Sequence, residues 1–213
     1  MKKNIKMKNK IPILIGVIWL FCISGIIGIL SPMSSWFLKM TPLNLGIMLF
    51  IILLQIKNYK LKTILILTCP FLLGFLTEFI GVNYGFLFGD YSYGKNLGIK
   101  FHGVPIIICC NWLLLTIVSG DVAKFFFQEK WKSILAAAVI MTLLDILLEF
   151  SAPRFDFWEF YLGKVPLKNY LHWFMISIIA QICFQQIEIK TNKKTSYHIL
   201  GSLFLFFSLF LIL

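Results

Sequence analysis

The chain has 213 residues, of which 59% are hydrophobic, and its mean hydropathy is +0.87. A soluble domain is about 45–50% apolar, so this composition excludes a single water-soluble globular core. The formal net charge of +11 does not indicate nucleic-acid binding, because the lysines lie in short loops between apolar runs, a pattern that sets membrane orientation. The composition predicts an all-α, polytopic membrane helix bundle, with residues 1–213 forming a single integral membrane domain.

Seven apolar runs predict about seven membrane-spanning helices. In chain order they cover residues 11–30, 43–57, 61–80, 103–120, 131–150, 168–187 and 197–213. A hydrocarbon core about 30 Å thick needs about 20 apolar residues, and the second run is the shortest of the seven. The first run follows a lysine-rich tail but is longer than the apolar region of a signal peptide, so we expect a retained helix. The last run is almost purely Leu, Phe and Ile, so we expect it at the periphery, facing lipid.

Lysine and arginine are distributed unevenly between the two sides of this predicted bundle. The N-terminal tail and the loops at 57–62, 121–132 and 188–196 carry 14 of them, and the loops on the other side carry 6. The positive-inside rule therefore predicts a cytoplasmic N-terminus and an external C-terminus in the cytoplasmic membrane.

Two long loops are expected on the outer side, at 81–102 and 151–167. Both are rich in glycine and aromatic residues rather than in charge. Glycine interrupts helices, and tyrosine and tryptophan rings favour the membrane interface. We expect re-entrant or interfacial segments that cap a cavity, because irregular backbone at membrane depth needs protein or water to satisfy its polar groups.

The sequence also contains a possible internal repeat. The third span ends Leu-Thr-Glu-Phe at 76–79, and the fifth ends Leu-Leu-Glu-Phe at 147–150. Each following loop leads to Val-Pro, at 104–105 and 165–166, with a tryptophan seven residues after each proline. Such a repeat would be parallel, about the membrane normal. The loops differ in length by ten residues, so chance similarity is the alternative.

Three carboxylates fall within the predicted spans, namely Glu78, Asp145 and Glu149. An ionisable group near the centre of a span costs at least about 2.5–3.5 kcal/mol, which makes these three candidate catalytic residues. Asp145 and Glu149 are four residues apart and share one helix face. All three are expected in the outer half of the membrane. The alternative is that they are solvated at the interface or paired with Arg154 or Lys164.

Other polar and aromatic residues collect at the same level and are candidates for binding substrate or water. They are Asn83, Tyr84, Tyr91, Tyr93, His102, Asn111, Trp112, Trp158, Asn169, His172 and Trp173. The predicted inner half has nothing comparable. No HxxxH or HxxE pair is present, and the five cysteines lie in apolar runs without a CxxC pair, so no metal site is predicted.

Carboxyl groups in an apolar setting suit acid chemistry. Low dielectric disfavours the anion, so a buried carboxyl group can stay protonated at neutral pH and act as a general acid. Surrounding aromatic faces can stabilise a carbocation. These features fit proton addition to an alkene in a membrane-dissolved isoprenoid, but they do not single out that reaction.

The residues around these acids resemble the two signatures of a known family. The first runs EFIGVNYGFLFGDYSYG from residue 78, then Gly98, Gly103-Val104-Pro105 and Asn111-Trp112; the second has Asp145-Ile-Leu-Leu-Glu149, Trp158, Gly163, Val165-Pro166, Asn169-Tyr170 and Trp173-Phe174. Together they resemble the carotenoid 1,2-hydratase family, which includes γ-carotene 1′,2′-hydratases and bisanhydrobacterioruberin hydratases. The resemblance covers about residues 70–180, the expected catalytic core. Phe150 stands where the family tends to have proline.

The resemblance implies a carotenoid biosynthesis enzyme that hydrates the terminal C1=C2 double bond of an acyclic end group through a tertiary carbocation, without a cofactor or metal. Glu78, Asp145 and Glu149 would be the acid and the water-activating base, in an order left open. The reactants would be a membrane-dissolved carotenoid and water, and contact with other carotenoid-pathway enzymes stays open. The alternatives are an enzyme acting on another polyprenyl lipid, a proton-coupled transporter, which a bare inner half argues against, and a structural role.

Overall fold

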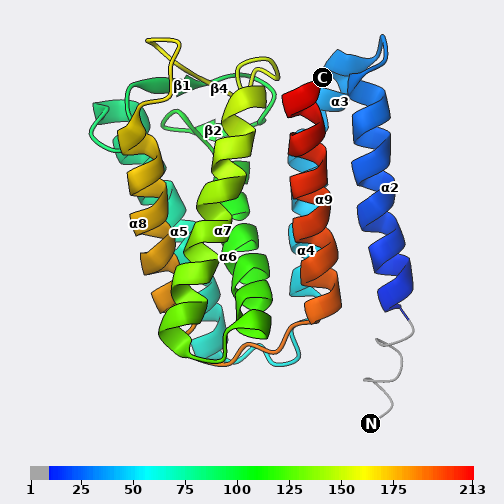
Figure 1. Cartoon of the computed structure of the whole chain (residues 1–213), viewed down its shortest axis with the longest axis vertical. Helices are drawn as coiled ribbons and strands as arrows, with labels where there is room; N and C mark the ends of the chain where they lie inside the picture. Colours follow the sequence, from blue (N-terminus) through cyan, green and yellow to red (C-terminus); the bar gives the residue numbers. More distant parts are fainter. Residues whose placement is uncertain (1–9) are drawn as a thin grey trace.

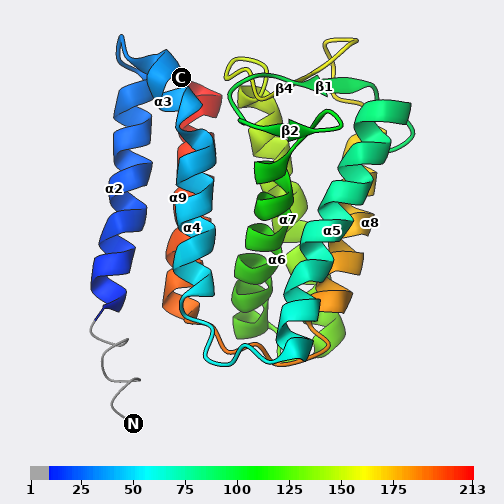
Figure 2. The same cartoon turned by 180° about the vertical axis from the view of Figure 1, so that it is seen from behind.

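The computed structural model describes residues 10–213, so four of the five lysines of the N-terminal tail lie outside it. The described residues form eight helices and four short strands. The helices are α2 (Ile11–Ile29), α3 (Ser34–Lys39), α4 (Thr41–Leu53), α5 (Leu61–Tyr84), α6 (Ile106–Phe126), α7 (Lys130–Ser151), α8 (Leu167–Phe184) and α9 (Lys193–Ile212). The strands are β1 (Tyr91–Tyr93), β2 (Lys100–Phe101), β3 (Val104–Pro105) and β4 (Trp158–Phe160). The longer helices run side by side, and the strands gather at one end of the bundle, here called the strand end (Figures 1 and 2).

Five of the described helices, α2, α5, α6, α7 and α9, are long and apolar enough to cross a membrane. The chain is a multi-pass membrane protein, but the predicted number of seven spanning helices is wrong. The helix α4 has 13 residues and is about 20 Å long at 1.5 Å per residue, shorter than a hydrocarbon core. The helix α8 has 18 residues but carries Lys168, Asn169, His172 and Gln181, and it is not among the candidate spans. Both lie alongside the other helices (Figure 1).

Prolines mark where several helices begin. Pro12 and Pro42 occupy the first turns of α2 and α4, where a missing backbone N–H leaves no hydrogen bond unmade. Pro105 and Pro166 directly precede α6 and α8. The two Val-Pro pairs of the sequence therefore mark corresponding helix starts. The short helix α3, which the sequence did not predict, connects α2 to α4.

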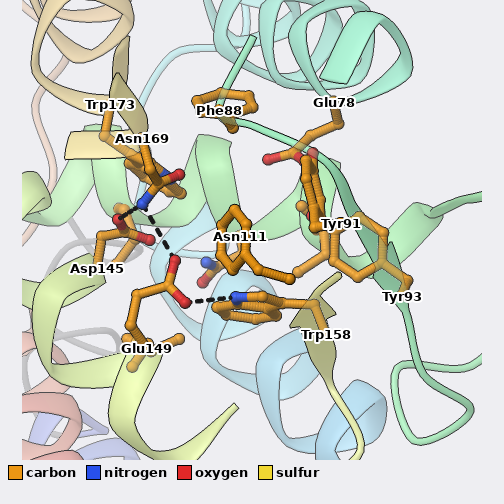
Figure 3. Close-up of a pocket in the computed structure, with 14 residues that line it drawn as sticks. Glu78, Phe88, Tyr91, Tyr93, Asn111, Asp145, Glu149, Trp158, Asn169 and Trp173 are labelled. Carbon is orange, nitrogen blue, oxygen red and sulfur yellow. Dashed lines mark hydrogen bonds between the residues drawn. The ribbon is translucent and has the colours of Figure 1, made fainter. Parts of the chain in front are cut away.

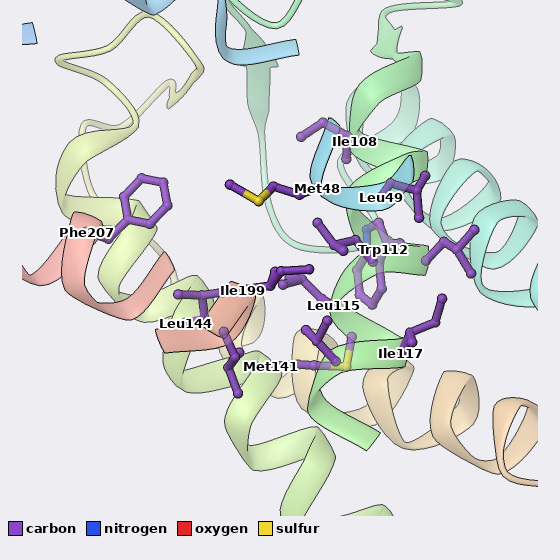
Figure 4. Packing of buried hydrophobic residues seen from close by; sticks show 14 of the residues in the cluster. Met48, Leu49, Ile108, Trp112, Leu115, Ile117, Met141, Leu144, Ile199 and Phe207 are labelled. Atoms are coloured by element: carbon purple, nitrogen blue, oxygen red, sulfur yellow. The ribbon is translucent and has the colours of Figure 1, made fainter. Parts of the chain in front are cut away.

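The core is built around α6, which packs against α4, α5, α7, α8 and α9. In the most apolar stretch of α6, 83% of the residues are buried, whereas in that of α2 only 17% are buried. Trp112, Leu115 and Ile117 of α6 meet Met141 and Leu144 of α7 in this core (Figure 4). The most peripheral apolar helix is thus α2. The helix α9 packs between α2, α6 and α7, so the expectation that it lies at the periphery is wrong.

The two long loops meet at the strand end. Strand β1 pairs with β4 in antiparallel fashion, with Tyr91 opposite Phe160 and Tyr93 opposite Trp158. Strands β2 and β3 form a second small pair. The fold is therefore mostly helical rather than purely helical, because the loops satisfy their backbone groups by strand pairing. Gly94 lets them approach closely, since a Cβ there would lie 2.2 Å from the Asp156 carbonyl oxygen.

The opposite end of the bundle contains buried, hydrogen-bonded polar side chains, so the expectation of a bare inner half is wrong. Asp121 is buried in α6 and accepts hydrogen bonds of 2.5 Å from Thr191 and from Ser196. Gln181 donates to the Thr116 carbonyl oxygen at 2.9 Å. The sequence missed Asp121 because α6 continues to Phe126, beyond the predicted end at residue 120.

Candidate active site

All three carboxylates singled out in the sequence line one cavity near the strand end (Figure 3). The lining residues are Glu78, Phe88, Tyr91, Tyr93, Ile108, Asn111, Leu115, Asp145, Leu148, Glu149, Trp158, Phe160, Asn169 and Trp173. They come from α5, α6, α7, α8, both strands of the β1–β4 pair and the loop before β1. Elements from the two halves of the predicted repeat therefore contribute to a single site.

Glu78 is held by three hydrogen-bond donors. The Tyr91 and Tyr93 hydroxyls donate to its Oε2 at 2.6 and 2.7 Å. The Trp112 indole Nε1 donates to its Oε1 at 3.0 Å. Tyr91 and Tyr93 both reach Glu78 because they are two residues apart on one strand, and side chains at that spacing lie on the same face.

Asp145 and Glu149 are linked through one amide group. The Asn169 Nδ2 atom donates to Asp145 Oδ2 and to Glu149 Oε1, each at 3.1 Å. The Trp158 Nε1 atom donates to Glu149 Oε2 at 2.9 Å. The expected common face of Asp145 and Glu149 is therefore present. In Figure 3 this pair lies on one side of the cavity and Glu78 on the other.

No basic side chain neutralises these acids within residues 10–213, where the one salt bridge joins Lys132 to Glu129. Arg154 instead donates to the Phe210 carbonyl oxygen, and Lys164 is exposed. The alternative in which Arg154 or Lys164 pairs with the acids is therefore not what the structure shows. Burying an unpaired anion costs several kcal/mol. Over the same residues, no group of three His, Cys, Asp or Glu side chains is arranged to hold a metal ion.

The two tyrosines remain hydrogen-bond donors over a wide pH range. Burial, and then the nearby Glu78 carboxylate, raise the pKa of Tyr91 and of Tyr93 well above the usual value. Both hydroxyls therefore keep their protons at any physiological pH. They can orient Glu78 or a bound water, but they cannot serve as bases there.

Aromatic rings form much of the remaining wall. Trp112 and Trp173 stack with their centroids 4.1 Å apart and their planes 11° from parallel. These are the tryptophans at equivalent positions of the two predicted repeats. The equivalent segments β1 and β4 also pair with each other, and α5 contacts α8 as α6 contacts α7. This arrangement agrees with an approximate two-fold relation whose halves meet at the cavity.

Five residues predicted to bind substrate or water do not line the cavity. Asn83, Tyr84 and His102 are exposed, and Asn83 donates to the His102 carbonyl oxygen at 3.1 Å. Trp112 is fully buried behind Glu78. The His172 ring accepts a hydrogen bond of 3.4 Å from the Phe88 backbone N–H. Trp112 and His172 thus support the wall, while the other three lie outside it.

The sequence analysis also missed part of the lining. Phe88, Ile108, Leu115, Leu148 and Phe160 face the cavity. Phe160 was detectable, because it alternates with Trp158 about an exposed Glu159, as expected of a strand with one buried face. The others have no distinguishing polarity, and only packing places them.

The fold and cavity define a class of protein, namely a polytopic helical membrane protein with an acid-lined, aromatic cavity at one end of its bundle. Residues 36–213 match the family model described as "Carotenoid biosynthesis protein", and the chain belongs to this family. The resemblance inferred from the two signatures is thereby confirmed at the level of the family.

One curated relative is a bisanhydrobacterioruberin hydratase from Haloarcula japonica. The chain is 25% identical to it over 120 residues, which cover 50% of this chain and 39% of the relative. The matched region is thus well under half of the relative's length. No solved structure matches the chain.

Proposed function

We propose that this protein hydrates the terminal C1=C2 double bond of an acyclic carotenoid end group. The observation that carries the proposal is the cavity in which three carboxyl groups, without basic partners, face aromatic rings. Membership of the carotenoid biosynthesis family and the distant hydratase relative support it. The whole chain is proposed as one membrane domain, with the catalytic core in about residues 70–180.

The proposed reaction needs one acid, one base and one water. A carboxylic acid transfers its proton to C2, the π electrons form the new C–H bond, and a tertiary cation remains at C1. The oxygen of water then bonds to C1, and its extra proton passes to a carboxylate, so the net change is the addition of one water. Glu78 and the Asp145–Glu149 pair lie on different sides of the cavity, so a double bond between them would have a carboxyl group on each side.

The aromatic wall would stabilise the cation. Trp158, Phe160, Phe88 and Trp173 present ring faces or edges to the cavity, and a cation near a ring face gains about 0.5–2 kcal/mol. Asn111 and Asn169 are the amides that line the same space and would hold the water. With the orientation predicted from the lysines, water would arrive from the outer face and the polyene from the membrane.

The direct test is expression in a bacterium that accumulates lycopene or γ-carotene. Hydration is expected to increase the carotenoid mass by one water, about 18 Da, in extracted pigment. Unchanged pigment in cells whose membranes contain folded protein would refute the proposal. Modification of a different polyprenyl lipid in the same cells would instead favour the related enzyme function.

A second candidate is a proton-coupled transporter, which the buried polar residues Asp121 and Gln181 favour. The two functions differ in their dependence on Asp121. If the protein is a hydratase, Asp121→Asn leaves hydration in place, because Asp121 lies at the opposite end from the cavity. A transporter would lose proton-coupled uptake in the same variant and would leave carotenoid mass unchanged.

A further inference from the structure

A second cavity adjoins the acid-lined one and is not explained by the chemistry above. It is walled mainly by apolar residues of α4, α7 and α9. Leu45 and Met48 of α4, Leu144 of α7 and Leu203 of α9 are among the lining residues.

The two cavities share a boundary. Ile108, Asn111, Leu148 and Trp158 line both of them. Trp158 connects the two chemically, because its indole N–H donates to Glu149 in the acid-lined cavity. A molecule could therefore place one end beside the carboxyl groups and the adjoining part among apolar side chains.

We infer that this second cavity binds the acyclic isoprenoid chain next to the reacting end group. The inference rests on the proposed function and identifies where the unreactive part of that substrate lies. The isoprenoid chain is a hydrocarbon, so its binding is favourable only when it is buried against apolar side chains. The second cavity is walled by more such side chains than the acid-lined cavity. The residues that line both cavities would contact the substrate where its chain joins the end group.

One polar atom in the second cavity allows a sharp control. The side-chain oxygen of Asn44 is buried and has no hydrogen-bond partner among the described residues, and Asn44 lines the cavity. Asn44→Leu replaces the carboxamide with a branched apolar group of similar shape and removes both of its polar atoms. A hydrocarbon occupant is therefore retained in this variant, whereas an occupant chosen by its polar groups is lost.

The test measures bound pigment in protein purified in detergent from lycopene-producing cells. Leu45→Trp and Leu203→Trp place an indole in the cavity from two different helices. Each is expected to lower the pigment-to-protein ratio by about tenfold, the effect of a modest loss of binding free energy. Leu205→Trp is the matched control, since Leu205 is on the same helix as Leu203 and is 42% exposed, and it is expected to keep its pigment.

The outcomes separate this inference from the proposed function. Glu149→Gln should stop hydration yet retain pigment, because it leaves the second cavity open. If wild-type protein binds lycopene, the two tryptophan variants do not, and lycopene is never converted, the inference about the second cavity holds and the proposed function fails. The inference about the second cavity is wrong if both tryptophan variants keep full pigment while thermal melting shows that they are folded. It is also wrong if Asn44→Leu loses as much pigment as they do.

Discussion

At the scale of single residues, the acids are held by partners that come from distant parts of the chain. Glu78 receives its donors from β1 and α6, and Glu149 receives one from β4 and one from α8. Each carboxyl group therefore has a fixed position but no compensating cation. This combination supports the proposed acid–base chemistry.

The first prediction concerns the acids themselves. Glu78→Gln and Glu149→Gln keep side-chain size but remove the proton, and each is expected to lower hydration by about 10²-fold or more, because general acid–base catalysis contributes that much. Product is measured by mass spectrometry of the extracted carotenoid. Glu159→Gln is the control, because Glu159 is exposed on the same strand as Trp158. Full activity in both site variants would disprove the assignment.

The second prediction concerns pH. Burial and Glu78 raise the pKa of Tyr91 and Tyr93 in the folded protein, whereas in the unfolded chain a tyrosine titrates near 10. A raised pKa means that the stabilisation is complete below about pH 10 and is lost as the pH rises beyond it. The double variant Tyr91→Phe/Tyr93→Phe should therefore lose less thermal stability than wild type between neutral and strongly alkaline pH. If the thermal stability of both proteins falls equally with rising pH, this prediction is wrong.

At the scale of elements, the position of Glu78 depends on how closely α5 approaches α6. Gly74 of α5 lies against Trp112 of α6, where an added Cβ would be 2.5 Å from the indole ring. Trp112 in turn donates to Glu78 and stacks on Trp173. Because residue 74 has no side chain, α5 can pack closely against α6. The same close packing fixes the position of Trp112 and therefore of the Glu78 carboxyl group.

The third prediction follows from this contact. Gly74→Ala should displace Trp112, destabilise the fold by about 1–3 kcal/mol through overpacking, and reduce hydration. Thermal unfolding and pigment conversion measure the two effects. Gly46→Ala, in α4, is the matched control, because a Cβ there meets nothing within 4 Å. If Gly74→Ala and Gly46→Ala have the same stability and the same hydration activity, the contact between Gly74 and Trp112 does not control the site.

At the scale of the whole molecule, the chain alternates between two ends of the bundle. The N-terminal start of α2 lies at the end opposite the strands, and the C-terminus lies at the strand end (Figure 1). The lysine distribution predicts that the first of these ends is cytoplasmic. In that orientation the acid-lined cavity would lie toward the external leaflet.

The fourth prediction tests this orientation. A periplasmic-type phosphatase fused after Leu213 is expected to be active, whereas the same enzyme fused within the loop near residue 188 is expected to be inactive. A fluorescent protein that folds only in the cytoplasm should give the reverse pattern. The opposite result would place the cavity toward the cytoplasm and would require water to enter from that side.

The sequence by itself determined the membrane class, the positions of most helices, the family, and the three acids worth testing. These follow from apolar run length, the cost of a charge in a span, and local motifs, none of which needs long-range contacts. Only the tertiary structure decided that five helices rather than seven are candidate spans, that the two loops pair as strands, and that Asn83, Tyr84 and His102 lie outside the cavity. It also supplied Asp121, Phe88 and the second cavity. The physical reason is that burial and hydrogen-bond partners depend on packing between segments far apart in the chain, which periodicity and composition do not encode.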